Sequence, residues 1–461
     1  MHFRPAADWK GIGYGFDWMR ITDFEHITFA NSRGDRQKYQ ATVSNHYRSG
    51  TRELETNGNA WRGDFEPNPT MFRQLEEKYK FNHILNKVIT NEETGARTFG
   101  KYYCPWLSIY PEKTITVSLI IEVLTDEPPQ SFRFEENEFF NMGEITASLN
   151  KGMNYLTDAL TIECVKEFDS DQEIVIFAVD KNGEERIAGR LLVWANNQRK
   201  KAKVVSVIVQ TIPEIPTETP MQSDVNLHKE NTAHYLRQAY VEYDSDEVVE
   251  LDLSGDEDFK NTYIQDVKNH GVPQRAIIGY YFARFVRDTC TESGRPFIRF
   301  ETPPGCLGKI PENFRRLDDV LRHKLYLQEG DKYEDYIFVF YLDRAGGAIS
   351  FAADGARRFH ELGGYFSQCV RTVMLFAGTN AYTVAHELGH AFNLPHTFAN
   401  RTAHGIRVSK MFTYKALTTD NVMDYSHLNS TFNIIPRNCF WYWQWIQMNK
   451  SIDNNGLIAN R

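Results

Sequence analysis

Short runs of alternating hydrophobic and polar residues dominate the first 211 positions, a pattern typical of β-strands that bury one face. Turn-forming residues such as Asn182 and Gly183 separate the later runs. We therefore expect a β-rich domain over residues 1–126 and a small antiparallel domain, similar to a β-sandwich, over residues 127–211. The runs that support this prediction lie at 114–123, 160–165, 173–179, 187–194 and 204–209.

The pattern changes after residue 211. Residues 212–227 hold three prolines among Thr, Glu and Ser, a composition that stiffens the backbone and predicts a linker. From residue 228 to residue 461 helical and strand-like patterns alternate, which favours an α+β domain. Strands are predicted at 336–342, 347–352 and 372–376, followed by a helix from about residue 380.

Length and composition exclude several classes of protein. At 461 residues the chain is too long for one hydrophobic core, so several domains are expected. The net charge of −9 argues against a nucleic-acid partner, because binding to phosphates requires an excess of Lys and Arg. No apolar stretch approaches the roughly 20 residues of a transmembrane helix, so we expect no membrane span. We also see no secretory signal at the N-terminus.

The six cysteines are scattered singly along the chain, without a Cys-x-x-Cys pair. This spacing argues against a metal site built from cysteines. Cys290 and Cys306 are the pair closest in sequence. The even count permits disulfides, and buried free thiols are the alternative.

The strongest chemical signal is the segment His386-Glu387-Leu388-Gly389-His390. On a helix, residues four apart lie one above the other on the same face, so both imidazoles can reach one cation. His396 follows six residues after His390 and cannot join them from a straight helix. A sharp turn must therefore intervene, and Asn393 is one of the few non-glycine residue types that tolerate the positive φ such a turn often needs.

Three histidines on one zinc ion leave a fourth position for water, whose pKa falls to roughly 7 in such sites. Glu387 lies beside the first ligand and is placed to take the proton of that water as a general base. We therefore predict one zinc ion per chain, held by His386, His390 and His396, and the hydrolysis of peptide bonds.

A working site has two alternatives. A chance His-Glu-x-x-His in a chain with 14 histidines has a probability on the order of a few per cent, and the third histidine lowers it about thirtyfold. A degenerate site that binds zinc only for stability is the second alternative, against which the intact Glu387 argues.

The segment from His386 to His396 resembles the elongated zinc motif of the metzincin metallopeptidases, H-E-x-x-H-x-x-G-x-x-H. Asn393 stands where that motif has glycine. The later segment 421–426 (NVMDYS) is similar to the family's methionine turn. The resemblance implies that Met423 lies beneath the metal site and that Tyr425 ligates zinc or stabilises the transition state. It also implies a mixed sheet with an edge strand that pairs with substrate, for which residues 347–352 are the candidate.

Residues 7–18 and 102–111 are similar to leader regions of Bacteroidetes proteins linked to contact-dependent, type VI-like secretion. That resemblance implies a protein secreted or delivered outside the producing cell, with a secretion apparatus as a partner. Together these features predict a multidomain zinc endopeptidase that acts on a protein or peptide substrate. The alternatives are a non-enzymatic adhesion or secretion-apparatus protein with a vestigial zinc domain, and an antibacterial toxin that cleaves a cell-envelope peptide.

Three further residues near the motif left two interpretations open. His404 and His427 either support the site or are ordinary structural histidines. Asp424 either supports a zinc-ligating histidine or caps the turn. The aromatic run 439–446 predicts a buried terminal helix beneath the site.

Overall fold

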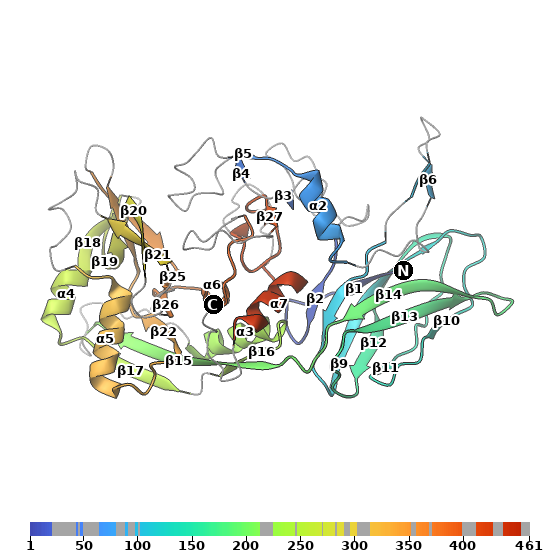
Figure 1. Ribbon diagram of the computed structural model, residues 1–461, viewed down its shortest axis with the longest axis horizontal. Coiled ribbons are helices and arrows are strands. Elements are labelled where there is room, and N and C mark those ends of the chain that lie inside the picture. The colour runs from blue at the N-terminus through green and yellow to red at the C-terminus, as the bar shows by residue number, and fades with distance from the viewer. Residues whose placement is uncertain are drawn as a thin grey trace.

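The structure is a computed structural model. It comprises a β-sandwich, a larger sheet covered by helices on both faces, and a smaller four-stranded sheet (Figure 1). The described residues are 1–20, 43–44, 47–48, 64–79, 88–90, 97–99, 102–212, 225–244, 247–269, 271–281, 284–289, 296–301, 314–351, 356–367, 371–398, 412–426 and 437–452.

The β-sandwich consists of two sheets whose inner faces share one hydrophobic core. Val117 and Leu119 from one sheet and Ile174 and Ile176 from the other are buried in it, as their alternation predicts. The first sheet has the order β1 (His2–Pro5), β9 (Lys113–Val123), β12 (Gly152–Cys164), β11 (Phe140–Met142). The second has the order β10 (Ser131–Phe134), β13 (Gln172–Val179), β14 (Glu185–Val193), β8 (Trp106–Ser108), β2 (Gly15–Asp17).

This pairing corrects the predicted division at residue 126. Strand β9 precedes that position and pairs with β12, which follows it. In the same way β8 pairs with β14. Strands from the predicted domains 1–126 and 127–211 therefore form a single sandwich, because hydrogen bonding between strands distant in sequence decides which strands share a sheet.

The larger sheet is parallel except for one edge. Its order is β16 (Val241–Asp244), β15 (Lys200–Gln210), β22 (Ile337–Leu342), β26 (Thr372–Leu375), β25 (Gly364–Ser367), with β17 (Val248–Asp252) also paired to β15. Strand β25 runs antiparallel to β26 at the edge of the sheet. The placement of residues 204–209 in the sandwich was wrong, because they belong to β15 and pair with β22. Their continuous apolar run suits a parallel sheet buried on both faces.

Alternate residues of β22 and β26 enter two different cores. Ile337, Val339 and Tyr341 face the core shared with the sandwich, while Phe338 and Phe340 face a second core. Helices α3 (Val225–Arg237) and α6 (Ala381–Ala391) cover the first face. Helices α4 (Glu257–Tyr263) and α5 (Leu317–Glu329) cover the second. The predicted strands at 336–342 and 372–376 and the helix from about 380 are thus confirmed.

The smaller sheet has the order β18 (Ile264–Asn269), β19 (Val272–Tyr281), β23 (Gly346–Phe351), β24 (Arg357–Leu362). Residues 347–352 were predicted to be an edge that pairs with substrate, and this was wrong. They fall largely in β23, which is hydrogen-bonded to β19 on one side and to β24 on the other. A strand with two partners has no free ladder to offer an extended peptide.

Short elements complete the described chain. They are the pairs β3 (Val43–Ser44) with β27 (Thr413–Tyr414), β4 (Tyr47–Arg48) with β5 (Asp64–Phe65), β6 (Val88–Thr90) with β7 (Arg97–Phe99), and β20 (Arg284–Thr289) with β21 (Pro296–Glu301), and the helices α2 (Pro69–Glu76) and α7 (Tyr442–Lys450). Most of the predicted linker, residues 213–224, lies outside the described residues, and α3 begins at Val225.

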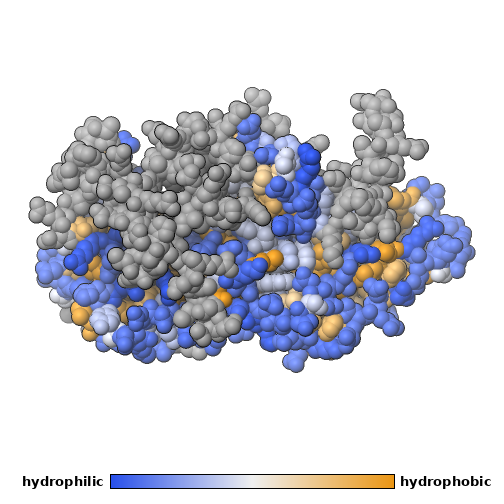
Figure 2. Space-filling model, in the orientation of Figure 1, coloured by the Kyte–Doolittle hydropathy of each residue, from blue (hydrophilic) through white to orange (hydrophobic). Residues whose placement is uncertain are grey.

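Three properties of the described residues bear on the sequence analysis. Cys104, Cys164 and Cys439 are buried free thiols, whereas Cys290 and Cys306 lie outside the described part. Among the described helices, none combines the length and the apolar character needed to cross a membrane. The face of the molecule in Figure 2 is mostly hydrophilic where it is described, with small hydrophobic areas over the sandwich.

Aromatic side chains join the sandwich to the helical half. Trp106 of β8 stacks on Tyr442 of α7 with ring centroids 3.8 Å apart. Trp194, just after β14, stacks on Tyr240 at 4.8 Å and on Trp445 at 6.4 Å. These rings belong to one continuous core, so the two halves are packed together rather than tethered. The predicted burial of the 439–446 run is confirmed for Trp441 and Trp445.

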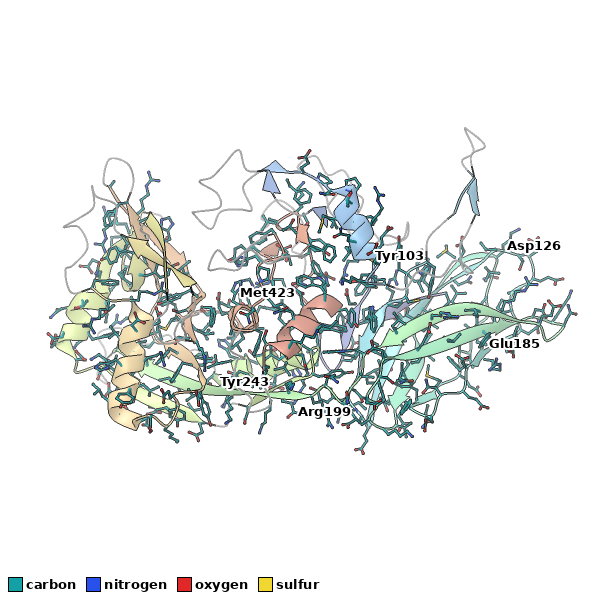
Figure 3. The ribbon with its side chains drawn as sticks, viewed as in Figure 1. Tyr103, Asp126, Glu185, Arg199, Tyr243 and Met423 are labelled. Carbon is teal, nitrogen blue, oxygen red and sulfur yellow. The ribbon has the colours of Figure 1, made fainter. Side chains whose placement is uncertain are left out.

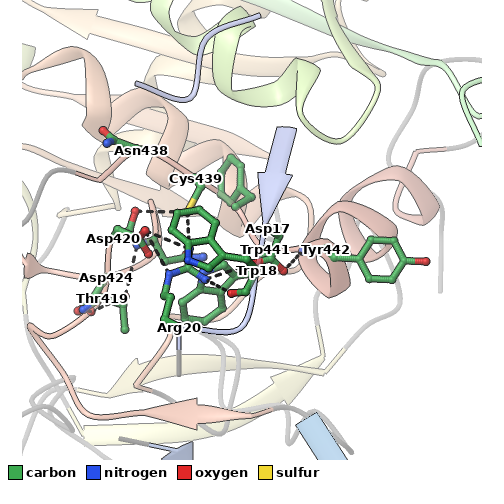
Figure 4. A network of polar contacts seen from close by, with 12 residues as sticks. Asp17, Trp18, Arg20, Thr419, Asp420, Asp424, Asn438, Cys439, Trp441 and Tyr442 are labelled. Atoms are coloured by element: carbon green, nitrogen blue, oxygen red, sulfur yellow. Dashed lines mark hydrogen bonds and ion pairs between the residues drawn. The ribbon is translucent and has the colours of Figure 1, made fainter. Parts of the chain in front are cut away.

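A buried ion network makes the same connection at a second place (Figure 4). The guanidinium of Arg20 donates to Asp17 at 3.2 Å and to Asp420 at 3.0 Å, and it lies 4.1 Å from the ring centroid of Trp18. Asp17 also accepts from the backbone N–H of Tyr442 at 2.9 Å. The N-terminal segment is thereby fastened to the segment that precedes Met423.

Replacing Arg20 with Met should destabilise the protein by about 3 to 5 kcal/mol, because Asp17 would remain buried without its cationic partner. The thermal unfolding midpoint measures this. As the control, Arg133→Met removes the exposed ion pair with Glu185 and should leave the midpoint nearly unchanged. Equal midpoints for the two variants would contradict a structural role for the network.

Candidate metal centre

Helix α6 carries two of the three predicted ligands. The side chain of Asn380 caps its first turn by accepting from the backbone N–H of Thr383 at 3.1 Å. Its buried apolar residues pack into the core shared with the sandwich, and they are Val384, Ala385, Leu388 and Ala391. This packing fixes the rotation of the helix about its axis, so His386 and His390 lie on one face as predicted.

The helix ends in a Schellman motif that turns the chain back toward the site. The backbone N–H of Leu394 donates to Gly389 O at 2.9 Å, and that of Asn393 donates to His390 O at 3.0 Å. Asn393 has a φ of 64°, as its position in the sequence predicts. Its side chain donates to Ser451 Oγ at 3.2 Å, so the residue after α7 helps to hold the reversal.

The three histidines converge on one point. The Nε2 atom of His396 lies 3.2 Å from that of His390 and 3.2 Å from that of His386. On the other side of each ring, Nδ1 of His386 lies 2.9 Å from Val422 O, and Nδ1 of His390 lies 2.8 Å from Leu394 O. A carbonyl only accepts, so Nδ1 carries the proton and the Nε2 lone pair of each of these two rings faces the common point.

The arrangement fits a single metal ion. Zn–N bonds of about 2.0 to 2.1 Å in a tetrahedral site place neighbouring ligand nitrogens about 3.3 to 3.4 Å apart, close to the observed spacing. The backbone carbonyls of Val422 and Leu394 orient two of the rings, as second partners of metal-bound histidines commonly do. Within the described part of the chain, His386, His390 and His396 form a cluster that could hold a metal ion.

Burial keeps the three imidazoles neutral. It lowers the pKa of His390 to about 4. Burial, with the neighbouring His390, also lowers the pKa values of His386 and His396 well below the ordinary value. Neutral imidazole is the form that binds a metal, so the site needs no deprotonation at neutral pH.

Glu387 is buried beside the first ligand. Burial raises its pKa to about 8, which the positive charge of Arg437 and a hydrogen bond with the Phe366 backbone partly oppose. Phe366 belongs to β25, so the antiparallel edge strand of the larger sheet lies against the predicted general base. No pattern in the sequence indicates this contact, because 364–367 (GYFS) does not stand out as a strand.

The predicted position of Met423 matches the structure. Its side chain is fully buried, and a Cβ added to Gly389 would lie 2.4 Å from Met423 Sδ. Helix α6 therefore rests directly on this methionine, and Figure 3 shows Met423 beside that helix. A side chain at position 389 would force Met423 to shift, so glycine suits this close approach.

Asp424 caps the turn, and none of its hydrogen bonds within the described residues involves a histidine. Its carboxylate accepts from the backbone N–H groups of Leu417, Thr419 and Tyr425 and from the Thr419 hydroxyl, at 2.7 to 2.9 Å. The hydrogen bonds thus favour the turn over the other predicted role, while His386 and His390 use backbone carbonyls. His404 and His427 lie outside the described residues.

Tyr425 borders the three histidines. Its ring centroid is 4.7 Å from that of His396 and 5.4 Å from that of His386. Burial, followed by the negative charge of Glu387, raises its pKa above the ordinary value, so its hydroxyl stays protonated at neutral pH. A protonated phenol is a hydrogen-bond donor.

Two residues near the site were not identified from the sequence. Tyr280 of β19 is close enough to Glu387 for the two to interact electrostatically. Arg437 interacts in the same way with Glu387 and with Tyr425. Neither belongs to a local motif, and only the folded chain brings them to the histidines.

Neither a search against protein-family models nor a search of curated proteins finds a match to this chain.

The lowered histidine pKa values predict a pH-dependent stability of the metal-free protein. Between pH 6.5 and about 4 the unfolded chain binds protons on these histidines and the folded chain does not, so the stability that the histidines contribute falls as the pH is lowered. His390→Gln removes one such group and should make the decline shallower. Thermal midpoints in EDTA across this range measure the slope, and identical slopes for variant and wild type would contradict the assignment.

Proposed function

We propose that this protein is a zinc-dependent endopeptidase. The observation that carries the proposal is the convergence of three imidazole nitrogens at 3.2 Å spacings beside the buried carboxyl of Glu387. A bound zinc ion would supply a Lewis acid that activates water and polarises the scissile carbonyl. The resemblance of the 386–396 and 421–426 segments to metzincins supports the same class.

Glu387 is the proposed general base. It accepts the proton of the attacking water and then transfers it to the departing amine. The pKa of about 8 belongs to the metal-free chain, and a cation nearby lowers the pKa of a carboxyl. Its contact with the Phe366 backbone holds the carboxyl toward the edge strand.

We propose β25 as the strand that aligns an extended substrate. It is antiparallel to β26 and ends the larger sheet, and Phe366 within it contacts Glu387. Strand addition at this edge would place a peptide beside both the base and the metal ligands. This replaces residues 347–352 in the role predicted from the sequence.

Glu387→Gln should lower kcat by about 10²- to 10⁴-fold on a denatured protein substrate, because the amide cannot accept the proton. Zinc content, measured by elemental analysis, should stay at one ion per chain since the three histidines are intact. Wild-type protein that carries one zinc but cleaves no member of a broad peptide library would contradict the proposed activity and favour a vestigial site.

Tyr425→Phe should lower kcat while KM changes little, if the hydroxyl donates to the developing oxyanion. Steady-state kinetics on one peptide separates the two parameters. The matched control is Tyr326→Phe, which changes an exposed tyrosine on α5. Unchanged kcat in Tyr425→Phe would remove this residue from the catalytic group.

A further inference from the structure

Arg437 is a buried cation next to the candidate metal centre. Its side chain is 4% exposed, and burial lowers the pKa of its guanidinium. In the part of the chain that the structure describes, no hydrogen bond and no ion pair reaches it. The guanidinium instead lies over the aromatic ring of Tyr382, whose centroid is 5.4 Å from Cζ of Arg437. A guanidinium has five N–H donors, so burial without acceptors is costly.

The nearby carboxylates do not neutralise it. Asp424 is within electrostatic range, but its oxygens already accept four hydrogen bonds from the turn that it caps. Glu387 is also within range, yet no ion pair within 4.0 Å joins the two among the described residues. Among the described residues the guanidinium therefore has no paired carboxylate, and its charge remains available to a ligand.

The position of Arg437 relates it to the proposed substrate path. Tyr382, over which it lies, is one turn before His386 on α6, so both side chains share a face of the helix. The charge of Arg437 also acts on His386, Glu387 and Tyr425. A group held by Arg437 would thus lie beside the first turns of α6, next to the reacting atoms.

We propose that Arg437 is a substrate-binding residue that binds a carboxylate of the substrate. Through this contact it directs the enzyme to peptides with an acidic group close to the scissile bond. Arginine and carboxylate form paired, charge-assisted hydrogen bonds, which would satisfy the donors that have no acceptor in the described part of the chain. The carboxylate belongs either to an Asp or Glu side chain or to the free C-terminus of the peptide. The proposal rests on the endopeptidase function proposed above.

The test compares matched peptides that differ in one carboxyl group. One set carries a single Glu at successive positions, the second carries Gln at the same positions with an amidated C-terminus, and the third carries Gln with a free C-terminal carboxylate. Dissociation constants are measured by fluorescence anisotropy on the full-length, zinc-loaded Glu387→Gln variant, and kcat/KM on the active protein. Binding is thereby read independently of cleavage, so a failure of the proposed activity remains distinguishable.

We expect at least about tenfold tighter binding of one carboxylate-bearing set than of its Gln-amide match. Adding Arg437→Gln should abolish this preference, and Arg437→Lys should retain part of it. The matched control Arg186→Gln removes an exposed charge with 80% side-chain exposure in the sandwich and should keep the preference. The better of the two carboxylate sets identifies the source of the group.

Equal affinity of the Glu387→Gln protein with Arg437 intact for all three peptide sets would overturn the proposal. So would a preference that persists in Arg437→Gln protein with normal zinc content and thermal midpoint. Where Arg437→Gln lowers the midpoint or zinc content, Arg437→Lys decides, and an unchanged preference in that variant would assign the discrimination to another residue.

Discussion

The reversal of the chain after α6 is the constraint on which the candidate metal centre depends. A straight helix aligns His386 and His390 but carries His396 away from them. The left-handed backbone of Asn393 ends the helix and returns the chain, and the same turn presents Leu394 O to the ring of His390. One local conformation thus brings the third candidate ligand, His396, to the site and orients the second, His390.

Contacts from the sandwich help to hold the segments that surround this site. Arg20 binds Asp420, which precedes the Met423 turn by only a few residues. Met423 in that turn packs directly against Gly389 of α6. Val422 O, which orients His386, belongs to the same turn. Helix α7 completes the connection, since its aromatic residues pack against the sandwich while Ser451 holds the end of α6. The predicted separation between N-terminal modules and a zinc domain understates this dependence.

Features of the site that depend on residues close together in the chain could be predicted from the sequence. The three histidines, the positive φ of Asn393 and the support from Met423 follow from residues less than 40 positions apart. Sheet membership did not follow, because the apolar run 204–209 suits a sandwich core and a parallel sheet equally well. The edge strand was misplaced for a related reason, since only the distant partner β19 makes β23 a central strand. Arg437 has no local signature at all.

Burial links the three kinds of group at the site. The desolvation that keeps the histidines neutral also raises the pKa of Glu387 to about 8 and lowers the pKa of the Arg437 guanidinium. Neutral imidazoles favour a cation, a cation restores the anionic carboxylate, and the guanidinium favours an anionic ligand. Among the described residues, each of these groups therefore lacks the charge that would complete it, which is the expected consequence of building a polar site in a dry interior.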